Sequence, residues 1–195
     1  MGAPSNTEPT ILQLKISLVG VSKPAVWRRV LVPADVRLDR LHEVIQAAMG
    51  WEDYHMHVIT NGSAEYGIPD PELGHRDERR TMLNHLLERP GDRIQYTYDF
   101  GDGWEHDILV EGVLAGVPDA PYPVCLTGKG ACPPEDCGGV WGYAQLREAL
   151  ADPAHEEHED MLEWLGLDGA SEFDPASFDV DKVNGALGLV GAARR

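Results

Sequence analysis

The segment from residue 96 to residue 143 holds the side chains that are best suited to chemistry. It contains all three cysteines, Cys125, Cys132 and Cys137, and a histidine, His106, in an otherwise apolar strand pattern. Thiolates and imidazoles are the ligands that Zn²⁺ prefers in proteins. An odd number of cysteines within thirteen positions does not make a disulfide framework. We therefore predict a zinc site formed by these four residues.

The cysteine spacing leaves a second interpretation open. Six residues separate Cys125 from Cys132 and four separate Cys132 from Cys137, whereas structural zinc sites usually have closer pairs. Pro133 and Pro134 would stiffen the second interval and hold both sulfurs on one side. The alternative is a set of buried free cysteines, which behave as small hydrophobic residues, and a core histidine with a satisfied hydrogen bond.

A second candidate metal site involves two histidines of the segment 54–60. Strand alternation would place His55 and His57 on one face, about 6–7 Å apart. Two imidazoles with a carboxylate from Asp53, Asp99 or Asp102 could hold a catalytic divalent metal. The alternative is a half-exposed strand surface whose histidines bond to neighbours or to water.

The third candidate is the acidic pair Glu135 and Asp136, which follows two prolines and precedes two glycines. These carboxylates could act as acid and base groups, because an apolar pocket favours the protonated form of a carboxyl. They could equally hold the loop by capping a helix or binding backbone amides. We predict that they line a pocket with four aromatic residues of the same segment, Tyr98, Trp104, Trp141 and Tyr143. The sequence has no nucleophile elbow, phosphate-binding glycine loop, dinucleotide fingerprint or HExxH helix.

The elements that must position these residues follow from hydrophobic periodicity. Alternating or apolar segments predict strands, and apolar residues at helical spacing predict helices. The expected strands are 12–18, 26–32, 54–60, 93–100 and 104–113, and the expected helices are 38–48, 82–88, 142–150, 155–165 and one that begins at 179. Residues 63–80 are expected to be irregular. Residues 114–142 show neither period, and so long a loop in a compact domain is usually functional or braced.

The strands 93–100 and 104–113 predict a hairpin around the turn 101–103. A three-residue turn would pair Phe100 with Trp104 and Tyr98 with His106, which gives one aromatic and aliphatic face. The opposite face would be polar. A slip of one residue would exchange the faces of one strand, so the register is an inference.

The fold class expected from these elements is α+β. We predict a single domain over residues 11–190, with a twisted mixed or antiparallel sheet and helices packed mainly on one face. Residues 1–10 and 191–195 are expected to be flexible.

The charge of the chain limits its partners. The net charge is −17 at pH 7, and residues 101–195 hold 19 acidic and 5 basic residues. So acidic a surface repels nucleic acid and anionic lipid. No apolar run approaches the length of about 20 residues that spans a bilayer, and the first ten residues do not resemble a secretory signal. The expected location is cytoplasmic, and a protein or small-molecule partner is left unidentified.

Several segments together resemble the plasmid pRiA4b ORF-3-like family. They are PAVWRRVLVP (24–33), LHEVIQAAMGWEDYHMHVI (41–59), YDFGDGWEHDI (98–108), CLTGKGACPPEDCGGVWGY (125–143), DPAHEEHEDMLEWLG (152–166) and FDPASFDVDKVNGAL (173–187). The resemblance implies an α+β domain from a group associated with plasmids and transposable elements, with no assigned function. Some relatives carry resolvase-like labels, but recombination needs a nucleophile within a basic DNA-binding surface, and this sequence offers no such setting.

Three functional hypotheses follow. The first is a non-enzymatic binding or adaptor module of a plasmid- or transposon-associated family, with the long cysteine-containing loop stiffened by zinc. The second is a metal-dependent hydrolase that uses His55, His57 and His106 with an acidic residue. The third is a DNA-binding accessory protein that uses basic residues of the N-terminal half, namely Arg28, Arg29, Arg76, Arg79 and Arg80. The alternative for these arginines is solvated surface charge.

Overall fold

The computed structural model describes residues 8–192, which form one eight-stranded sheet and four α-helices. The strands are β1 (Thr10–Leu18), β2 (Trp27–Pro33), β3 (His57–Asn61), β4 (Ala64–Gly67), β5 (Arg76–Asp77), β6 (Arg93–Tyr98), β7 (Trp104–Ala115) and β8 (Val124–Lys129). The α-helices are α1 (Leu38–Met49), α2 (Gly139–Ala151), α3 (His158–Leu165) and α4 (Val180–Ala192). Short 3₁₀ helices are Glu78–Arg80, Leu83–His85 and Ala170–Glu172.

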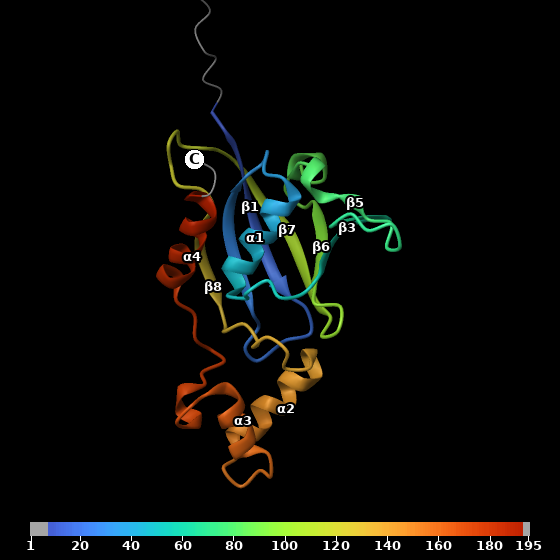
Figure 1. Cartoon of the computed structure of the whole chain (residues 1–195). Helices are drawn as coiled ribbons and strands as arrows, with labels where there is room; N and C mark the ends of the chain where they lie inside the picture. The colour runs from blue at the N-terminus through green and yellow to red at the C-terminus, as the bar shows by residue number, and fades with distance from the viewer. Residues whose placement is uncertain (1–7, 193–195) are drawn as a thin grey trace, which may run out of the picture.

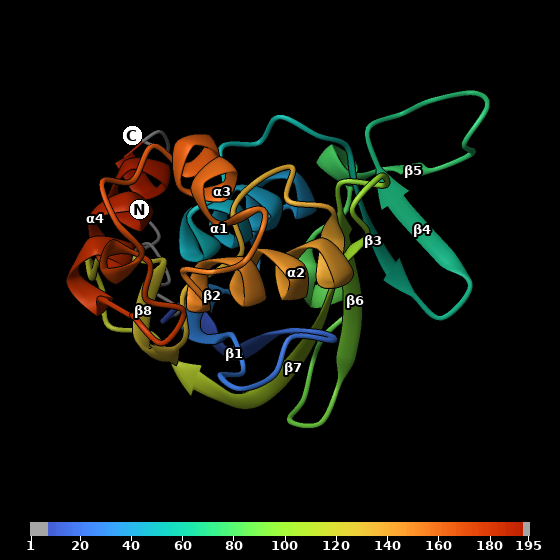
Figure 2. The same cartoon turned by 90° about the horizontal axis from the view of Figure 1, so that it is seen from below.

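The sheet is mixed and has the strand order β5-β4-β3-β6-β7-β1-β2-β8. Neighbouring strands pair antiparallel except β4 and β5, which pair parallel. The sheet curves around α1, which lies on its concave face (Figures 1 and 2). Helix α4 lies beside α1 and β8, whereas α2 and α3 lie together at one end of the sheet. None of the helices within residues 8–192 is long and apolar enough to cross a membrane.

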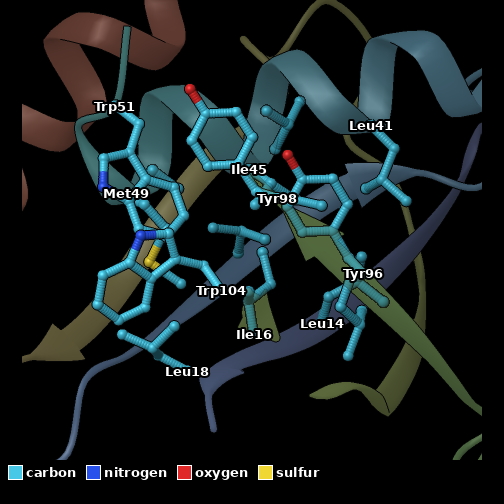
Figure 3. Packing of buried hydrophobic residues seen from close by; sticks show 14 of the residues in the cluster. Leu14, Ile16, Leu18, Leu41, Ile45, Met49, Trp51, Tyr96, Tyr98 and Trp104 are labelled. Atoms are coloured by element: carbon cyan, nitrogen blue, oxygen red, sulfur yellow. The ribbon is translucent and has the colours of Figure 1, made fainter. Parts of the chain in front are cut away.

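The core lies between α1 and the concave face of the sheet. Alternating residues of β1, including Leu14 and Ile16, point toward Leu41 and Ile45 of α1 (Figure 3). The spacing of the apolar residues on α1 explains this, because positions three and four apart share one helix face. The opposite face of the sheet is polar, as strand alternation requires. There Arg29 of β2 forms an ion pair with Glu111 of β7.

The predicted fold class is confirmed, because the chain forms one compact domain with a mixed sheet and separate helices. The first two strands, the helix at 38–48 and the central hairpin lie where periodicity placed them. The expected helix at 82–88 is only the 3₁₀ turn Leu83–His85. Residues 1–7 and 193–195 of the expected flexible ends lie outside the described residues, whereas Thr10 already pairs in β1 and α4 extends through Ala192.

Two predictions about irregular segments were wrong. Residues 114–142 include the edge strand β8, whose pairing with β2 is interrupted by a register shift. The segment 63–80 contains β4 and β5. They were missed because short strands at or near the edge of a sheet carry little alternation, and β4 and β8 also contain glycine.

The predicted register of the central hairpin was also wrong. The turn has five residues, 99–103, so Tyr98 pairs with Trp104 and Tyr96 with His106. The shift is two residues, so the inward face stays as predicted for these four side chains. Phe100, however, lies in the turn and is 47% exposed instead of facing Trp104.

Candidate metal centre

Three segments that are far apart in the sequence meet at one end of the sheet. They are the connection from α1 to β3, the turn between β6 and β7, and the loop that precedes α2. Trp51 of the first segment donates a hydrogen bond from its indole nitrogen to the carbonyl oxygen of Pro133, at 3.0 Å. Its ring stacks on Tyr98 with centroids 5.0 Å apart. The first and third segments are thus fixed to the central hairpin.

The turn between β6 and β7 fixes the carboxylate of Asp99. One oxygen, Oδ1, accepts hydrogen bonds from the backbone nitrogens of Gly101 at 2.9 Å and Asp102 at 3.3 Å. Asp99 has a positive φ of 54°, a conformation that aspartate tolerates better than most residues. The side chain is buried, and its second oxygen, Oδ2, is directed toward His55.

The loop before α2 is held in the same way. Glu135 accepts hydrogen bonds from the hydroxyl of Tyr98, at 3.2 Å, and from the backbone nitrogen of Glu52, at 2.8 Å. Burial raises the pKa of Tyr98 to about 12, so this hydroxyl keeps its proton at neutral pH and donates it. Asp136 follows with a positive φ of 57°. Both carboxylates therefore have fixed backbone positions beside the hairpin turn.

Close backbone contacts bring the start of α2 against the same turn. The Oδ2 atom of Asp102 accepts a hydrogen bond from the backbone nitrogen of Gly138, at 3.1 Å. A β carbon on Gly139 would overlap the carbonyl oxygen of Asp102, and one on Gly142 would overlap that of Cys137. These glycines are therefore required by contact between the loop, the helix and the turn.

The result is a group of one imidazole and three carboxylates, which we call the His55 group: His55, Asp99, Glu135 and Asp136. The Nε2 atom of His55 lies 2.9 Å from Asp136 Oδ1, 3.6 Å from Asp99 Oδ2 and 4.0 Å from Glu135 Oε2. This nitrogen is buried and makes no hydrogen bond within residues 8–192, although Asp136 Oδ1 lies close to it. The carboxylates repel one another, so a cation between them would be stabilised.

The spacing of the His55 group suits a metal ion. One ligand atom each from His55, Asp99 and Asp136 lies within 4.8 Å of the other two. Ligands bound at about 2.0–2.2 Å are separated by roughly 3–4 Å. Carboxylate oxygen with one imidazole nitrogen favours a divalent ion such as Mn²⁺ or Zn²⁺.

A second group lies beside the first, and we call it the His42 group: His42, Asp53, His57 and Glu78. The imidazoles of His42 and His57 stack with centroids 3.5 Å apart. Each Nε2 atom contacts a carboxylate, that of Asp53 at 2.9 Å from His42 and that of Glu78 at 2.7 Å from His57. Burial and the neighbouring His57 lower the pKa of His42 to about 4, so its imidazole is neutral at neutral pH.

A surface cleft of about 400 Å³ is lined by all four residues of the His42 group and by His55, and we call it the acidic cleft. Its lining includes acidic residues and histidines but no lysine or arginine. The lining residues are Asp39, His42, Glu43, Asp53, Tyr54, His55, Met56, His57, Ile68 and Glu78. The charge of the cleft therefore fits a metal ion or a cationic ligand.

The predicted pair His55 and His57 is divided between the two groups. Strand β3 begins at His57, so His55 precedes the strand. The direction of its side chain is therefore not set by strand alternation. The prediction that both lie on one strand face was wrong. The structure places Asp99 with His55, whereas Asp102 caps the start of α2.

The four predicted zinc ligands do not meet in the structure. Within residues 8–192, the groups of at least three ligands within coordinating distance contain none of the cysteines and not His106. Cys125 lies in β8, and Cys132 and Cys137 pack against the core. His106 is fully buried and its Nδ1 atom lies 3.1 Å from the carbonyl oxygen of Trp104. Zinc binding by these residues stays a prediction.

The remaining residues of the predicted pocket have different surroundings. Tyr98 contributes its hydroxyl to the His55 group, and Trp104 is buried in the core beside Trp51. Tyr143 is buried and contacts Phe173 edge-on. Trp141 is 84% exposed.

The arginines expected to contact DNA do not form an open basic patch. Arg28 is buried, and Arg29 is paired with Glu111. Arg79 and Arg80 both contact Asp77, whereas Arg76 lies over the ring of Tyr66. Three of these five arginines thus form ion pairs within the domain and Arg28 is buried, which does not favour the DNA-binding hypothesis.

Sequence analysis missed the roles of His42 and Glu78. His42 lies beside the apolar stripe of α1, one turn from Gln46, and both residues are hydrogen-bonded to the hydroxyl of Tyr96. Two polar residues four positions apart beside an apolar stripe were the available signal. Glu78 lies in a segment without periodicity, so nothing in the sequence indicated its contact with His57.

The fold and the site define a single-domain α+β protein with histidine and carboxylate groups at one end of its sheet. The chain belongs to the plasmid pRiA4b ORF-3-like protein family, whose model matches residues 10–182. It is 44% identical over 181 residues to the uncharacterized protein y4hQ of Sinorhizobium fredii, and the match covers 91% of each chain.

A solved structure resembles the fold. It is the crystal structure of a protein of unknown function, MM3350 from Methanosarcina mazei Go1, with a TM-score of 0.79 and 38% identity. The match covers 90% of the present chain and 98% of that chain. These relatives support the family and the fold, and their names describe no activity.

Proposed function

We propose that this chain is a metal-dependent binding protein, in which the His55 group holds a divalent ion and the acidic cleft receives a ligand. One observation carries the proposal: the buried Nε2 atom of His55 has no hydrogen bond within the described residues and faces three carboxylates. A divalent ion would satisfy this nitrogen and neutralise the carboxylates together. The proposed function remains the binding or adaptor module expected from the sequence, but the proposed metal site is the His55 group and not the cysteines.

The contacts around the ligands support the proposal. The Oδ1 atom of Asp99 accepts a hydrogen bond from a turn amide, and Glu135 accepts hydrogen bonds from the hydroxyl of Tyr98 and the backbone nitrogen of Glu52. Such secondary contacts orient metal ligands and raise metal affinity. His55 and Asp136 remain partly exposed, so an ion and a ligand can enter from the surface.

The test is metal binding by chelator-treated protein. We expect about one Mn²⁺ or Zn²⁺ per chain in isothermal titration calorimetry, with binding weakened at least about tenfold in His55→Ala. His85→Ala is the matched control, because His85 is an exposed histidine outside both groups. Equal affinity in wild type and His55→Ala would contradict the proposal.

Hydrolysis is a second candidate function, favoured by the two carboxylate–imidazole pairs in the same cleft. His42 with Asp53 and His57 with Glu78 have the arrangement in which a carboxylate orients a histidine that accepts a proton. A metal ion at the His55 group would supply a bound water of lowered pKa. His57 was named as a hydrolase residue from the sequence, whereas His106 lies in the core.

The hydrolase candidate is tested with Mn²⁺-loaded protein and nitrophenyl esters of acetate and phosphate. Metal-dependent turnover that His57→Ala or Glu78→Gln abolishes, with metal affinity unchanged, would support it. Saturable metal binding without turnover of either ester would contradict the hydrolase candidate and favour the metal-dependent binding protein.

A further inference from the structure

Arg28 is a buried cation on the inner face of the sheet. Its side chain extends from β2 toward the end of α1 and is 3% exposed as a residue. The Nε atom donates to the carbonyl oxygen of Ala48 at 2.9 Å. The Nη1 atom donates to the carbonyl oxygens of Trp27 and Lys129, each at 2.9 Å. The ring of Phe178 covers one side of the guanidinium, with its centroid 4.7 Å from Cζ.

These contacts satisfy only part of the guanidinium. A guanidinium has five N–H donors, and those of Nη2 make no hydrogen bond within residues 8–192. Across the same part of the chain, no carboxylate lies within 4.0 Å of Arg28. Burial lowers the pKa of Arg28, but an arginine side chain stays charged at neutral pH. A buried charge without an ion pair is costly, which is notable in a chain with a net charge of −17.

Arg28 lines a cavity of about 310 Å³ between α1, α4 and the loop that holds Cys132. Two further residues with donor side chains, Ser177 and Lys182, line this cavity. The acidic residue of the lining is Asp179, whose Oδ1 atom accepts hydrogen bonds from the backbone nitrogens of Asp181 and Lys182. The carboxylate of Asp179 thus caps α4 and forms no ion pair with Arg28.

We propose that this cavity binds an oxyanion, a phosphate or carboxylate group of a small ligand, through Nη2 of Arg28 with Lys182 and Ser177. Oxyanions accept charge-assisted hydrogen bonds from guanidinium and ammonium groups. The bound anion would supply the counter-charge that the protein itself does not place beside Arg28. The inference is independent of the His55 group, because the two sites share no residue.

A purely structural role for Arg28 predicts a different outcome. Its hydrogen bonds join β2, β8 and the last turn of α1, where a positive charge also complements the helix dipole. In that case Lys182, which is exposed and has no ion pair within residues 8–192, would not affect the affinity of the protein for anions.

The experiment titrates the full chain with inorganic phosphate and with acetate, at constant ionic strength, by isothermal titration calorimetry. We expect saturable binding of at least one anion, weakened about tenfold in Lys182→Ala and in Arg28→Lys. The more tightly bound anion identifies the ligand group. Lys15→Ala is the matched control, since Lys15 lies over Trp27 on the opposite face of the sheet.

Circular dichroism first establishes that each variant is folded. Lys182→Ala keeps the test decisive even if Arg28→Lys unfolds, because Lys182 is on the surface. Two results would overturn the proposal: no saturable binding of either anion to the wild-type chain, or an affinity that Lys182→Ala and Lys15→Ala leave equally unchanged.

Discussion

The hydroxyl of Tyr98 lies 3.2 Å from both carboxylate oxygens of Glu135 and also accepts a hydrogen bond from the backbone nitrogen of Tyr54, at 3.0 Å. This one hydroxyl therefore joins the three segments that form the His55 group. Tyr98 comes from the central hairpin, Glu135 from the loop before α2, and Tyr54 from the connection that carries His55. The positions of the candidate metal ligands therefore depend on the hydroxyl of Tyr98.

Tyr98→Phe should weaken metal binding while the fold is retained. Loss of the hydroxyl frees Glu135 and leaves a backbone donor without its acceptor. We therefore expect an affinity for the metal that is weaker by roughly tenfold, and a loss of about 1–2 kcal/mol in the free energy of unfolding. Calorimetric titration and urea unfolding measure both. Tyr122→Phe is the control, because the Tyr122 hydroxyl accepts an exposed hydrogen bond elsewhere. Wild-type metal affinity in Tyr98→Phe would contradict this role.

Gly142→Ala should disturb the loop that carries Asp136. An added β carbon would overlap the carbonyl oxygen of Cys137, and overpacking of this kind costs about 1–3 kcal/mol. Thermal unfolding should show a lower melting temperature, and metal affinity should fall with it. Gly185→Ala in α4 is the matched control, because its β carbon meets no atom within 4 Å. Alanine favours a helix by about 1 kcal/mol over glycine, so this variant should keep or raise stability.

His106 should make the protein less stable in mild acid. Burial lowers the pKa of His106 from 6.5 to about 4. The unfolded chain therefore binds more protons over this range, and stability falls as pH falls from about 6.5 to about 4. The difference corresponds to roughly 3 kcal/mol at most, at about 1.4 kcal/mol for each pH unit.

The corresponding variant is His106→Leu, which replaces the imidazole by an apolar side chain of similar size that cannot titrate. Urea unfolding at about pH 7 and about pH 5 should show a smaller difference between the two conditions than in wild type. His85→Leu serves as the control, since His85 is exposed. An unchanged pH dependence in His106→Leu would show that this imidazole does not titrate as its burial requires.

Much of the fold was predictable because hydrophobic periodicity reports on burial. The alternation of Leu12 to Leu18 and the helical stripe from Leu38 to Ile45 each correspond to an observed element. Register was not predictable, because it depends on whether the turn has three or five residues. In the structure Asp99 leaves the strand to cap the turn, and no local pattern distinguishes the two lengths.

The candidate site was predictable only in part. His55 and Asp99 were named in one hypothesis, and Glu135 and Asp136 in another. Their meeting depends on long-range contacts, such as that of Asp102 with Gly138, which a single sequence does not encode locally. A metal site was predicted at the cysteines because of their residue type. In the structure Cys125 belongs to an edge strand, where the side chain of Asn184 is hydrogen-bonded to its backbone nitrogen and its carbonyl oxygen.

Asp99→Asn should weaken metal binding with little change in shape. Replacing one carboxylate oxygen by an amide removes a negative charge from the His55 group, and the Oδ1 contacts to the turn can be kept. We expect an affinity for Mn²⁺ that is lower by about tenfold to a hundredfold. Asp107→Asn, on the polar face of β7, should bind Mn²⁺ like wild type. Equal affinities in the two variants would exclude Asp99 as a ligand.

The most direct test of the metal site is anomalous X-ray diffraction from crystals of the full chain grown with Mn²⁺. The account predicts an anomalous peak within about 2.0–2.4 Å of His55 Nε2, Asp99 Oδ2 and Asp136 Oδ1. A peak among His42, Asp53 and His57, a peak at the cysteines, or an empty His55 group at saturating metal would contradict it.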